Sequence, residues 1–121
     1  EILETTTEEN LAMLADSFRF LKSKGLTAFF DAEHFFDGYR DDPEFTLRVL
    51  RGAAEAGADC LVLCDTNGGS LPGQVEEMVA AVVAAVDCQV GVHLHNDTGC
   101  GVANALAGVA GGATQVQGTI N

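Results

Sequence analysis

The regular alternation of helix-like and strand-like segments is the feature that most constrains the fold of this chain. Apolar residues recur at helical spacing from about Thr7 to Lys24, and further helical segments begin near Pro43, Pro72 and Gly101. Each helical segment is followed by a short, largely apolar segment, and these span residues 26–32, 60–64, 89–95 and 115–120. Strands that are apolar on both faces are typical of parallel sheets covered by helices. The pattern therefore predicts an α/β fold with four parallel strands alternating with helices.

The spacing of the predicted strands favours one α/β architecture over another. Their starts lie roughly 30 residues apart, which is the repeat length of a (β/α)₈ TIM barrel. A closed barrel needs about 250 residues, and this chain has 121. We therefore expect one domain over residues 1–121 that forms about half of a barrel, with residues 37–42 and 65–73 as loops. A doubly wound open sheet is the alternative, although no Gly-x-Gly-x-x-Gly motif follows a strand.

Composition excludes several classes of partner. The chain has 18 acidic and 6 basic side chains, and its net charge is −12. Nucleic acids and anionic membranes attract a surplus of Lys and Arg, so we expect neither as a partner. A hydrophobic fraction of 47% is too high for a disordered acidic tail. The four cysteines show no Cys-x-x-Cys spacing, and we interpret them as reduced thiols of a cytoplasmic protein.

Polar side chains gather where the predicted strands end. The opposite ends of the same strands carry fewer of them, and this asymmetry is typical of an active site at the carboxyl edge of a parallel sheet. The four polar segments are Asp31–His34, Asp65–Gly69, His93–Asp97 and Gly118–Asn121.

The His93-Leu94-His95 segment is the sharpest chemical signal among these ends. Residues two apart in a strand project to the same side, so the two imidazoles provide half of a divalent-metal site. Asn96 and Asp97 could add an oxygen ligand or hold the imidazoles in place. A third protein ligand is still required. The alternative is that the histidines are ordinary residues of a buried strand.

Two further residues remain open from local sequence alone. Glu33 follows an aromatic-rich strand and is either a substrate-facing acid or base or a solvated loop carboxylate. Thr66 either donates its hydroxyl to a carboxylate substrate or is a turn residue before Asn67 and Gly68.

Several of these segments resemble a known family. His93–Asp97, Val102–Ala107 and Gly112–Asn121 are similar to the catalytic barrel of the DRE-TIM metallolyases. The Asn-Asp pair after the second histidine is typical of the acetyl-CoA-condensing branch, which makes isopropylmalate, homocitrate and citramalate. Phe30–Arg40 and Leu63–Gly69 look most like the citramalate-forming members.

The resemblance implies a site and a reaction. By it, the chain corresponds to strands four to seven of the family barrel, and His93 and His95 are ligands of Mg, Mn or Zn. Glu33 matches a catalytic glutamate beside the oxo acid, and Thr66 matches the threonine that binds its carboxylate. The implied substrates are acetyl-CoA and a 2-oxo acid, pyruvate for the citramalate-forming members. Isopropylmalate or homocitrate synthesis, or a lyase or aldolase reaction of the same superfamily, are the alternatives.

Two family segments are absent from these 121 residues. They are the Asp-Arg-Glu strand, which supplies a metal ligand, and the Gly-Glu-Arg-x-Gly-Asn stretch. The N-terminal strands and the final strand of the barrel are thus expected to be missing, and the fragment alone is expected to be inactive. A half barrel has two unpaired sheet edges, which predicts a homo-oligomer or, as a non-enzymatic alternative, an inert assembly module.

Overall fold

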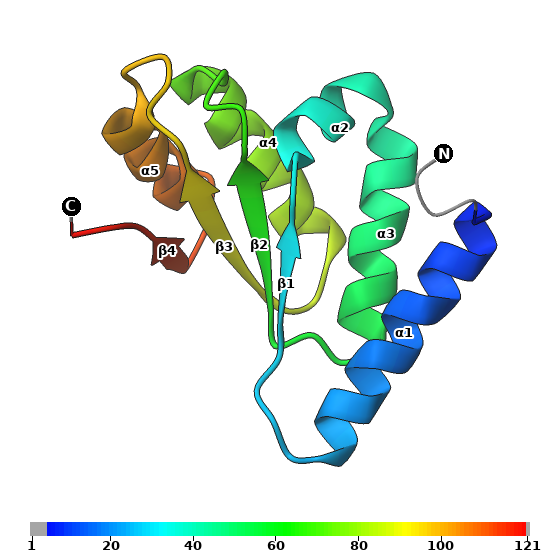
Figure 1. Ribbon diagram of the computed structural model, residues 1–121. Helices are drawn as coiled ribbons and strands as arrows, with labels where there is room; N and C mark the ends of the chain where they lie inside the picture. The colour runs from blue at the N-terminus through cyan, green and yellow to red at the C-terminus, as the bar shows by residue number, and fades with distance from the viewer. Residues whose placement is uncertain (1–4, 121) are drawn as a thin grey trace.

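The computed structural model describes residues 5–120 and contains one four-stranded parallel sheet. The strands are β1 (Phe29–Ala32), β2 (Cys60–Asp65), β3 (Gln89–Leu94) and β4 (Gln115–Gln117). The helices are α1 (Thr7–Ser23), α2 (Phe35–Asp41), α3 (Pro43–Glu55), α4 (Pro72–Ala85) and α5 (Gly101–Ala110). Figure 1 shows that the carboxyl ends of β1, β2 and β3 point to the same side of the molecule.

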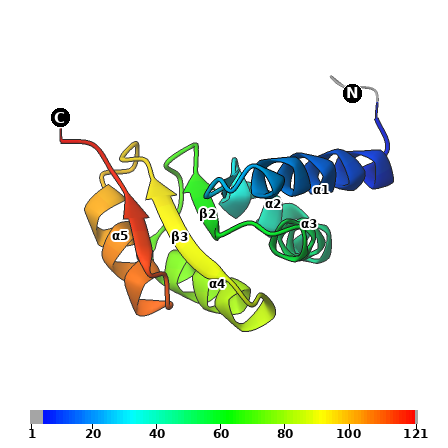
Figure 2. The same ribbon diagram turned by 90° about the horizontal axis from the view of Figure 1, so that it is seen from below.

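The sheet order confirms the α/β prediction. It also favours part of a TIM barrel over a doubly wound open sheet. The strands lie in the order β1-β2-β3-β4, so every strand pairs with its predecessor in the chain. A doubly wound sheet reverses its strand order at a switch point, and the described strands do not. In Figure 2, α4 and α5 lie on one side of β3 and β4, as barrel helices do.

Alternation along β2 divides the buried side chains between the two faces of the sheet. Leu61 and Leu63 belong to the main core, which they share with Val79 and Val82 of α4 and with Val92 of β3. The alternate β2 residues form a second, smaller buried cluster, which consists of Cys60, Val62 and Cys64. Cys60 and Cys64 are therefore small buried residues, as is usual for Cys within an apolar strand.

Two helix starts follow from local sequence. At α1, the Glu9 N–H donates to Thr6 Oγ1 at 3.2 Å, and the Glu9 carboxylate accepts from the Thr6 N–H at 2.8 Å. This capping box is the one that the Thr and Glu spacing predicts. At α3, Asp42 accepts the Phe45 N–H at 3.0 Å, and Pro43 occupies the first turn.

The prediction of a loop over residues 37–42 is wrong, because α2 occupies Phe35–Asp41. Its apolar anchors are Phe35 and Phe36, which are only 2% and 0% exposed. Burial of these two rings stabilises a seven-residue helix whose remaining polar residues carry no helical pattern.

Three predicted strands are shorter than expected. The first begins at Phe29 rather than Leu26, because pairing with β2 starts at Phe29. The third ends at Leu94, so His95 lies just beyond it. The fourth ends at Gln117 rather than Ile120, and Asn121 lies outside the described residues. Within residues 5–120, no helix is long and apolar enough to cross a membrane.

Candidate functional site

The two histidines predicted as metal ligands face each other at the carboxyl end of β3. His93 is half-buried in the strand, and His95 is exposed just after it. Their Nε2 atoms lie 3.2 Å apart, and the ring centroids are separated by 5.2 Å. Two nitrogens that bind one divalent ion at about 2.1 Å each lie about 3 Å apart, so the pair fits a shared ion.

The remaining ring nitrogen of His93 is engaged by a residue that sequence reasoning missed. Gln117 in β4 places its Oε1 atom 2.8 Å from His93 Nδ1. If Nδ1 carries the proton and donates it to this oxygen, the lone pair of Nε2 faces His95. Among residues 5–120, no group of three His, Cys, Asp or Glu side chains forms a metal site. The two histidines are therefore an incomplete ligand set.

Cys64 is the neighbour of His93 on the other side, because the two residues pair in the β2–β3 register. Burial, with smaller contributions from the Glu33 and Asp31 carboxylates, raises the pKa of the Cys64 thiol to about 12. The thiol is therefore neutral near pH 7, whereas a metal ligand must be a thiolate. Cys64 does not complete the ligand set as it stands.

Glu33 and Thr66 are brought together across the ends of β1 and β2. Thr66 Oγ1 donates to Glu33 Oε2 at 2.7 Å and accepts the backbone N–H of His34 at 2.8 Å. Asp65, which precedes Thr66, pairs in register with Leu94, which precedes His95. The Glu33–Thr66 pair and the two histidines thus leave the sheet at the same edge.

The β1 end turns sharply at His34. This residue has φ = 56°, the left-handed region, and no other non-glycine residue in the described part of the chain has a positive φ. Such a conformation costs roughly 1–2 kcal/mol, which the hydrogen bond to Thr66 and the burial of Phe35 help to offset. The turn directs the chain from β1 straight into α2.

Helix α2 is tied to the loop after β2 by a polar network. Asp37 accepts from Arg40 Nη2 at 2.6 Å and from Asn67 Nδ2 at 2.8 Å. The hydrogen bond from Arg40 is the main cause that holds the pKa of Asp37 below its usual value, and Asn67 contributes. Arg40 Nη1 also lies 3.3 Å from Ser70 Oγ. No sequence signal indicated this network, because it depends on the unpredicted helix.

Asn96 and Asp97 contact the surrounding loops. Asn96 Oδ1 accepts the Gly101 N–H at 2.8 Å, at the start of α5. Asp97 packs against Gly68, and the next residue, Thr98, donates its N–H to the Gly68 carbonyl at 3.2 Å. Within residues 5–120, neither side chain hydrogen-bonds to an imidazole, so their predicted roles beside the metal stay predictions.

Two buried polar side chains form hydrogen bonds with the backbone of the loop between β2 and α4. Asp65 and Asn104 are 1% and 0% exposed. Asp65 Oδ2 accepts the Ser70 N–H at 3.0 Å, while Asn104 Nδ2 donates to the Ser70 carbonyl at 2.8 Å. The loop that carries Thr66 is therefore anchored both to its own strand and to α5.

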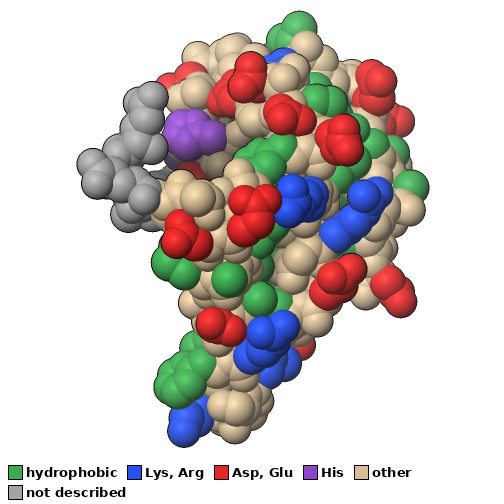
Figure 3. Space-filling model, turned by 90° about the vertical axis from the view of Figure 1, so that its right-hand side faces the viewer, with side chains coloured by type: hydrophobic (Ala, Val, Ile, Leu, Met, Phe, Trp, Pro, Cys, Tyr) green, Lys and Arg blue, Asp and Glu red, His purple; other side chains and the backbone are tan. Residues whose placement is uncertain are grey.

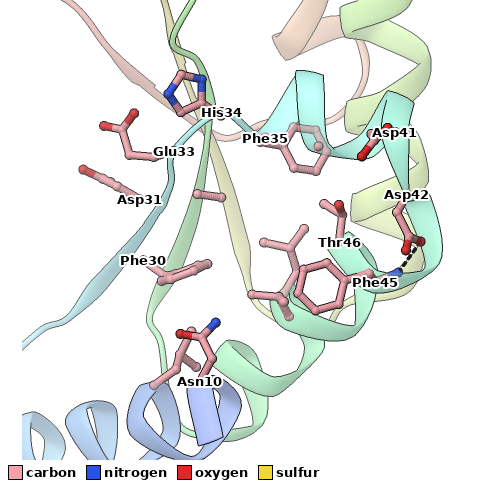
Figure 4. A pocket seen from close by; sticks show the side chains of 15 residues that line it. Asn10, Phe30, Asp31, Glu33, His34, Phe35, Asp41, Asp42, Phe45 and Thr46 are labelled. Carbon is pink, nitrogen blue, oxygen red and sulfur yellow. Dashed lines mark hydrogen bonds between the residues drawn. The ribbon is translucent and has the colours of Figure 1, made fainter. Parts of the chain in front are cut away.

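A cavity of about 560 Å³ lies between α1, β1 and α3, and Glu33 is the member of this cluster that lines it. Figure 4 shows the Phe30 and Phe45 rings on its walls, with Asp31 and Glu33 on the far side of β1 from Phe45. Neither His93 nor His95 lines it. The convergence of polar groups, and not the cavity, therefore marks the candidate site.

A family model and individual relatives both match almost the whole of this chain. The model of a family described as HMGL-like matches residues 2–121. The (R)-citramalate synthase of Streptomyces coelicolor is 56% identical over 119 residues, which cover 98% of this chain and 22% of that protein. The (R)-citramalate synthase of Sulfolobus acidocaldarius is 50% identical over the whole chain and 23% of its own length. The chain thus spans under a quarter of these relatives.

More distant relatives share the same region and fold. The homocitrate synthase of Saccharolobus solfataricus is 40% identical over 98% of this chain and 25% of its own length. The crystal structure of the HMG-CoA lyase of Bacillus subtilis superposes with a TM-score of 0.78 at 28% identity. That match covers 94% of this chain and 40% of the lyase. The four-stranded unit therefore matches part of a larger solved domain.

Proposed function

Because the chain belongs to the HMGL-like family, we propose that it forms strands four to seven of the catalytic barrel of an acetyl-CoA-condensing synthase. The proposed second substrate is a 2-oxo acid, pyruvate, and the product is citramalate. Two features support pyruvate over longer oxo acids. One is the higher identity to citramalate synthases than to homocitrate synthases. The other is the pair of segments Asp-Ala-Glu-His and Cys-Asp-Thr-Asn-Gly-Gly, which span the carboxyl ends of β1 and β2.

The observation that carries the proposal is the pair of facing Nε2 atoms of His93 and His95, 3.2 Å apart beside the Glu33–Thr66 pair. We assign both histidines to a divalent ion, Mg, Mn or Zn. Bound there, the ion supplies a Lewis acid for the ketone oxygen of the oxo acid. The imidazoles would hold that ion at the same sheet edge as Glu33.

Thr66 and Glu33 share one proton, and this defines their proposed roles. The Thr66 hydroxyl has a single hydrogen, which now points to Glu33. A substrate carboxylate that takes this hydrogen bond releases the Glu33 carboxylate as a free acceptor beside the reacting atoms. Glu33 is then available to accept a proton during condensation, which is the role of a general base.

The remaining parts of the site are assigned to the rest of a longer protein. The chain spans under a quarter of its citramalate synthase relatives, and two histidines do not complete a metal site. CoA is anionic, yet Arg40, which contacts Ser70 of the loop after β2, is engaged by Asp37. We therefore propose that the fragment alone does not turn over substrate. The four free cysteines fit a cytoplasmic enzyme.

The test replaces both histidines in the full-length synthase. His93→Ala with His95→Ala is expected to remove the bound metal and the pyruvate-dependent release of CoA together. Cys64→Ala is the matched control, because it changes the neighbour of His93 in the register and removes no assigned ligand. Retention of stoichiometric metal or of condensation by the double variant contradicts the assignment.

A lyase reaction is the second candidate, and the superposition on the Bacillus subtilis HMG-CoA lyase favours it. The same purified protein separates the two reactions. A synthase releases CoA only when acetyl-CoA and an oxo acid are both present, whereas a lyase cleaves a hydroxyacyl-CoA alone. If neither reaction occurs and metal does not bind, the inert assembly module is the remaining reading.

A further inference from the structure

We propose that Gln117 is the positioning residue of the metal site, a role that rests on the proposed function. Its amide oxygen lies 2.8 Å from His93 Nδ1. The contact joins two neighbouring strands, because His93 and Gln117 pair directly in the β3–β4 register. Paired residues of parallel strands project to the same face, so the contact follows from strand alignment.

The chemistry of imidazole explains why this contact matters. A neutral imidazole has one proton and two nitrogens, and only the nitrogen without the proton can bind a metal. Gln117 Oε1 accepts and cannot donate, so it keeps the proton on Nδ1 of His93. The lone pair of Nε2 then faces the Nε2 atom of His95 before any metal arrives.

The two histidines consequently differ in freedom. With the proton of His93 held by Gln117, the 3.2 Å contact between the Nε2 atoms requires His95 to be the donor. His95 is exposed, and within residues 5–120 no hydrogen bond to its Nδ1 atom is present. Its proton can therefore move to Nδ1 when a metal binds. His93 therefore has the metal-binding tautomer before the metal arrives, whereas His95 changes its tautomer when the metal binds.

The other inward glutamine of β4 keeps Gln117 in place. Gln115 pairs with Gly91, and its side chain fills the space that a Cβ atom at Gly91 would occupy. This interlocking holds β4 close to β3 two residues before Gln117. The amide of Gln117 therefore meets a ring whose strand is already aligned with its own.

The experiment uses the full-length protein in its metal-free form, with ¹⁵N-labelled histidine. The wild-type spectrum is expected to show His93 protonated on Nδ1, identified by loss of its signal in His93→Ala. Gln117→Leu removes the acceptor, and the His93 proton is expected to redistribute toward Nε2. The affinity for Zn²⁺ or Mn²⁺, measured by calorimetry, is expected to fall roughly 10- to 100-fold.

Two variants control for packing. Gln117→Glu keeps an oxygen acceptor at the same position, so the Nδ1 tautomer and most of the metal affinity are expected to survive. Val116→Leu alters the adjacent, outward-facing residue of β4, which is 48% exposed, and is expected to change neither readout. Rescue by glutamate alone separates the proposed role from a purely structural one.

Each outcome decides the proposal. An unchanged His93 tautomer with wild-type metal affinity in Gln117→Leu overturns it. If Gln117→Leu does not fold, loss of the Nδ1 tautomer in folded Gln117→Glu overturns it equally. If the wild-type protein binds no metal or condenses no substrate, the proposed function fails, and the spectra of the metal-free protein still decide whether Gln117 places the proton.

Discussion

Gly68 shows how one backbone position joins two loops of the candidate site. Its φ of +61° is readily adopted by glycine and rarely by other residues. A Cβ atom at Gly68 would lie 2.9 Å from the Asp97 backbone nitrogen, too close for any side chain. The Gly68 carbonyl also accepts the Thr98 N–H. The β2 and β3 loops therefore depend on this glycine for their contact.

Gly68→Ala is expected to destabilise the full-length synthase by about 1–2 kcal/mol from backbone strain alone, and further through displacement of Asp97. Chemical denaturation measures the change. Gly69→Ala is the matched control, because a Cβ atom there meets nothing within 4 Å and its φ is not left-handed. Equal stability of the two variants would count against the packing described for Gly68.

Thr66→Val preserves the shape of the side chain but removes the hydroxyl that joins the His34 N–H to Glu33. We expect kcat/KM for the oxo acid to fall roughly tenfold or more, since a hydrogen bond to a charged group contributes about 1.5–3 kcal/mol. Thr66→Ser retains the hydroxyl and is expected to keep most of the activity. Steady-state kinetics with varied oxo acid provide the measurement, and similar losses in both variants would refute the hydroxyl's role.

Some residues of the candidate site can be identified from local sequence patterns, and others cannot. His93, His95, Glu33 and Thr66 could be selected because histidines two apart and polar residues after apolar strands form local patterns. Gln117 could not, since its importance comes from a partner 24 residues away on another strand. A glutamine near a strand end has no distinctive local signature.

At the scale of elements, a close helix contact joins α4 to the end of α5. A Cβ atom at Gly111 would lie 2.6 Å from the Glu76 carbonyl oxygen and 3.0 Å from Val79 Cβ. Gly111 has an ordinary helical φ of −71°, so its requirement for glycine is steric and not conformational. The two helices can approach this closely only because the side chain is absent.

Gly111→Ala is therefore expected to destabilise the fold by about 1–3 kcal/mol, the usual cost of overpacking. Gly73→Ala serves as its control within α4, because a Cβ atom there meets nothing within 4 Å. Thermal unfolding of both variants in the full-length protein gives the comparison. An unchanged midpoint for Gly111→Ala would mean that α4 and α5 are packed more loosely than described.

Asp59 ties α1 to the start of β2 and makes this attachment dependent on pH. Its carboxylate accepts from Lys22 Nζ at 2.8 Å and from the Ala28 N–H at 2.7 Å. The hydrogen bond from Lys22, followed by that from Ala28, lowers the pKa of Asp59. A lowered pKa stabilises the folded state above the unfolded value, near pH 4, and this contribution disappears as the pH falls through the folded pKa.

We expect Asp59→Asn to be less stable than the wild type at pH 7. On acidification below about pH 4, its free energy of unfolding is expected to fall by less than that of the wild type. Denaturation at a series of pH values measures both effects. Asp16→Asn is the comparison, because the Asp16–Arg19 pair lies within α1 and joins no second element. If the free energy of unfolding varied with pH in the same way for wild type and Asp59→Asn, the stabilising role of the Asp59 hydrogen bonds would be contradicted.

Helix prediction succeeded where the pattern was local and failed where it was not. The α1 capping box and the Asp42-Pro43 start of α3 are encoded within a few residues. Helix α2 has Phe35 and Phe36 at its start and mostly polar residues afterwards. Its stability comes from burial of these rings, which depends on the surface presented by the other elements.

For the molecule as a whole, both ends of the sheet expose apolar side chains. At the β1 end, Phe20, Leu26 and Phe29 are exposed. At the β4 end, Val102 and Leu106 of α5 are 79% and 69% exposed. The outer edges of β1 and β4 pair with no strand among the described residues. In Figure 3, by contrast, charged side chains of both signs are mixed over the face near α1 and α3.

The isolated 121-residue chain is therefore expected to self-associate. Unpaired strand edges and exposed apolar side chains both favour contact between copies. Light scattering after size-exclusion chromatography is expected to give a mass of at least twice 12.6 kDa, rising with concentration. Leu106→Lys, which places a charge on the exposed face of α5, is expected to reduce the association. A monodisperse wild-type monomer over the same range would contradict the prediction.

The sequence by itself determined the α/β class, the order of most elements and the edge at which the polar residues meet, because these depend on apolar periodicity and short capping motifs. Tertiary structure alone decided the facing of His93 and His95, the Gln117 contact, the hydrogen bond between Glu33 and Thr66, and helix α2. These features arise from strand register and ring burial, which bring residues from distant parts of the chain into contact and so leave no local pattern.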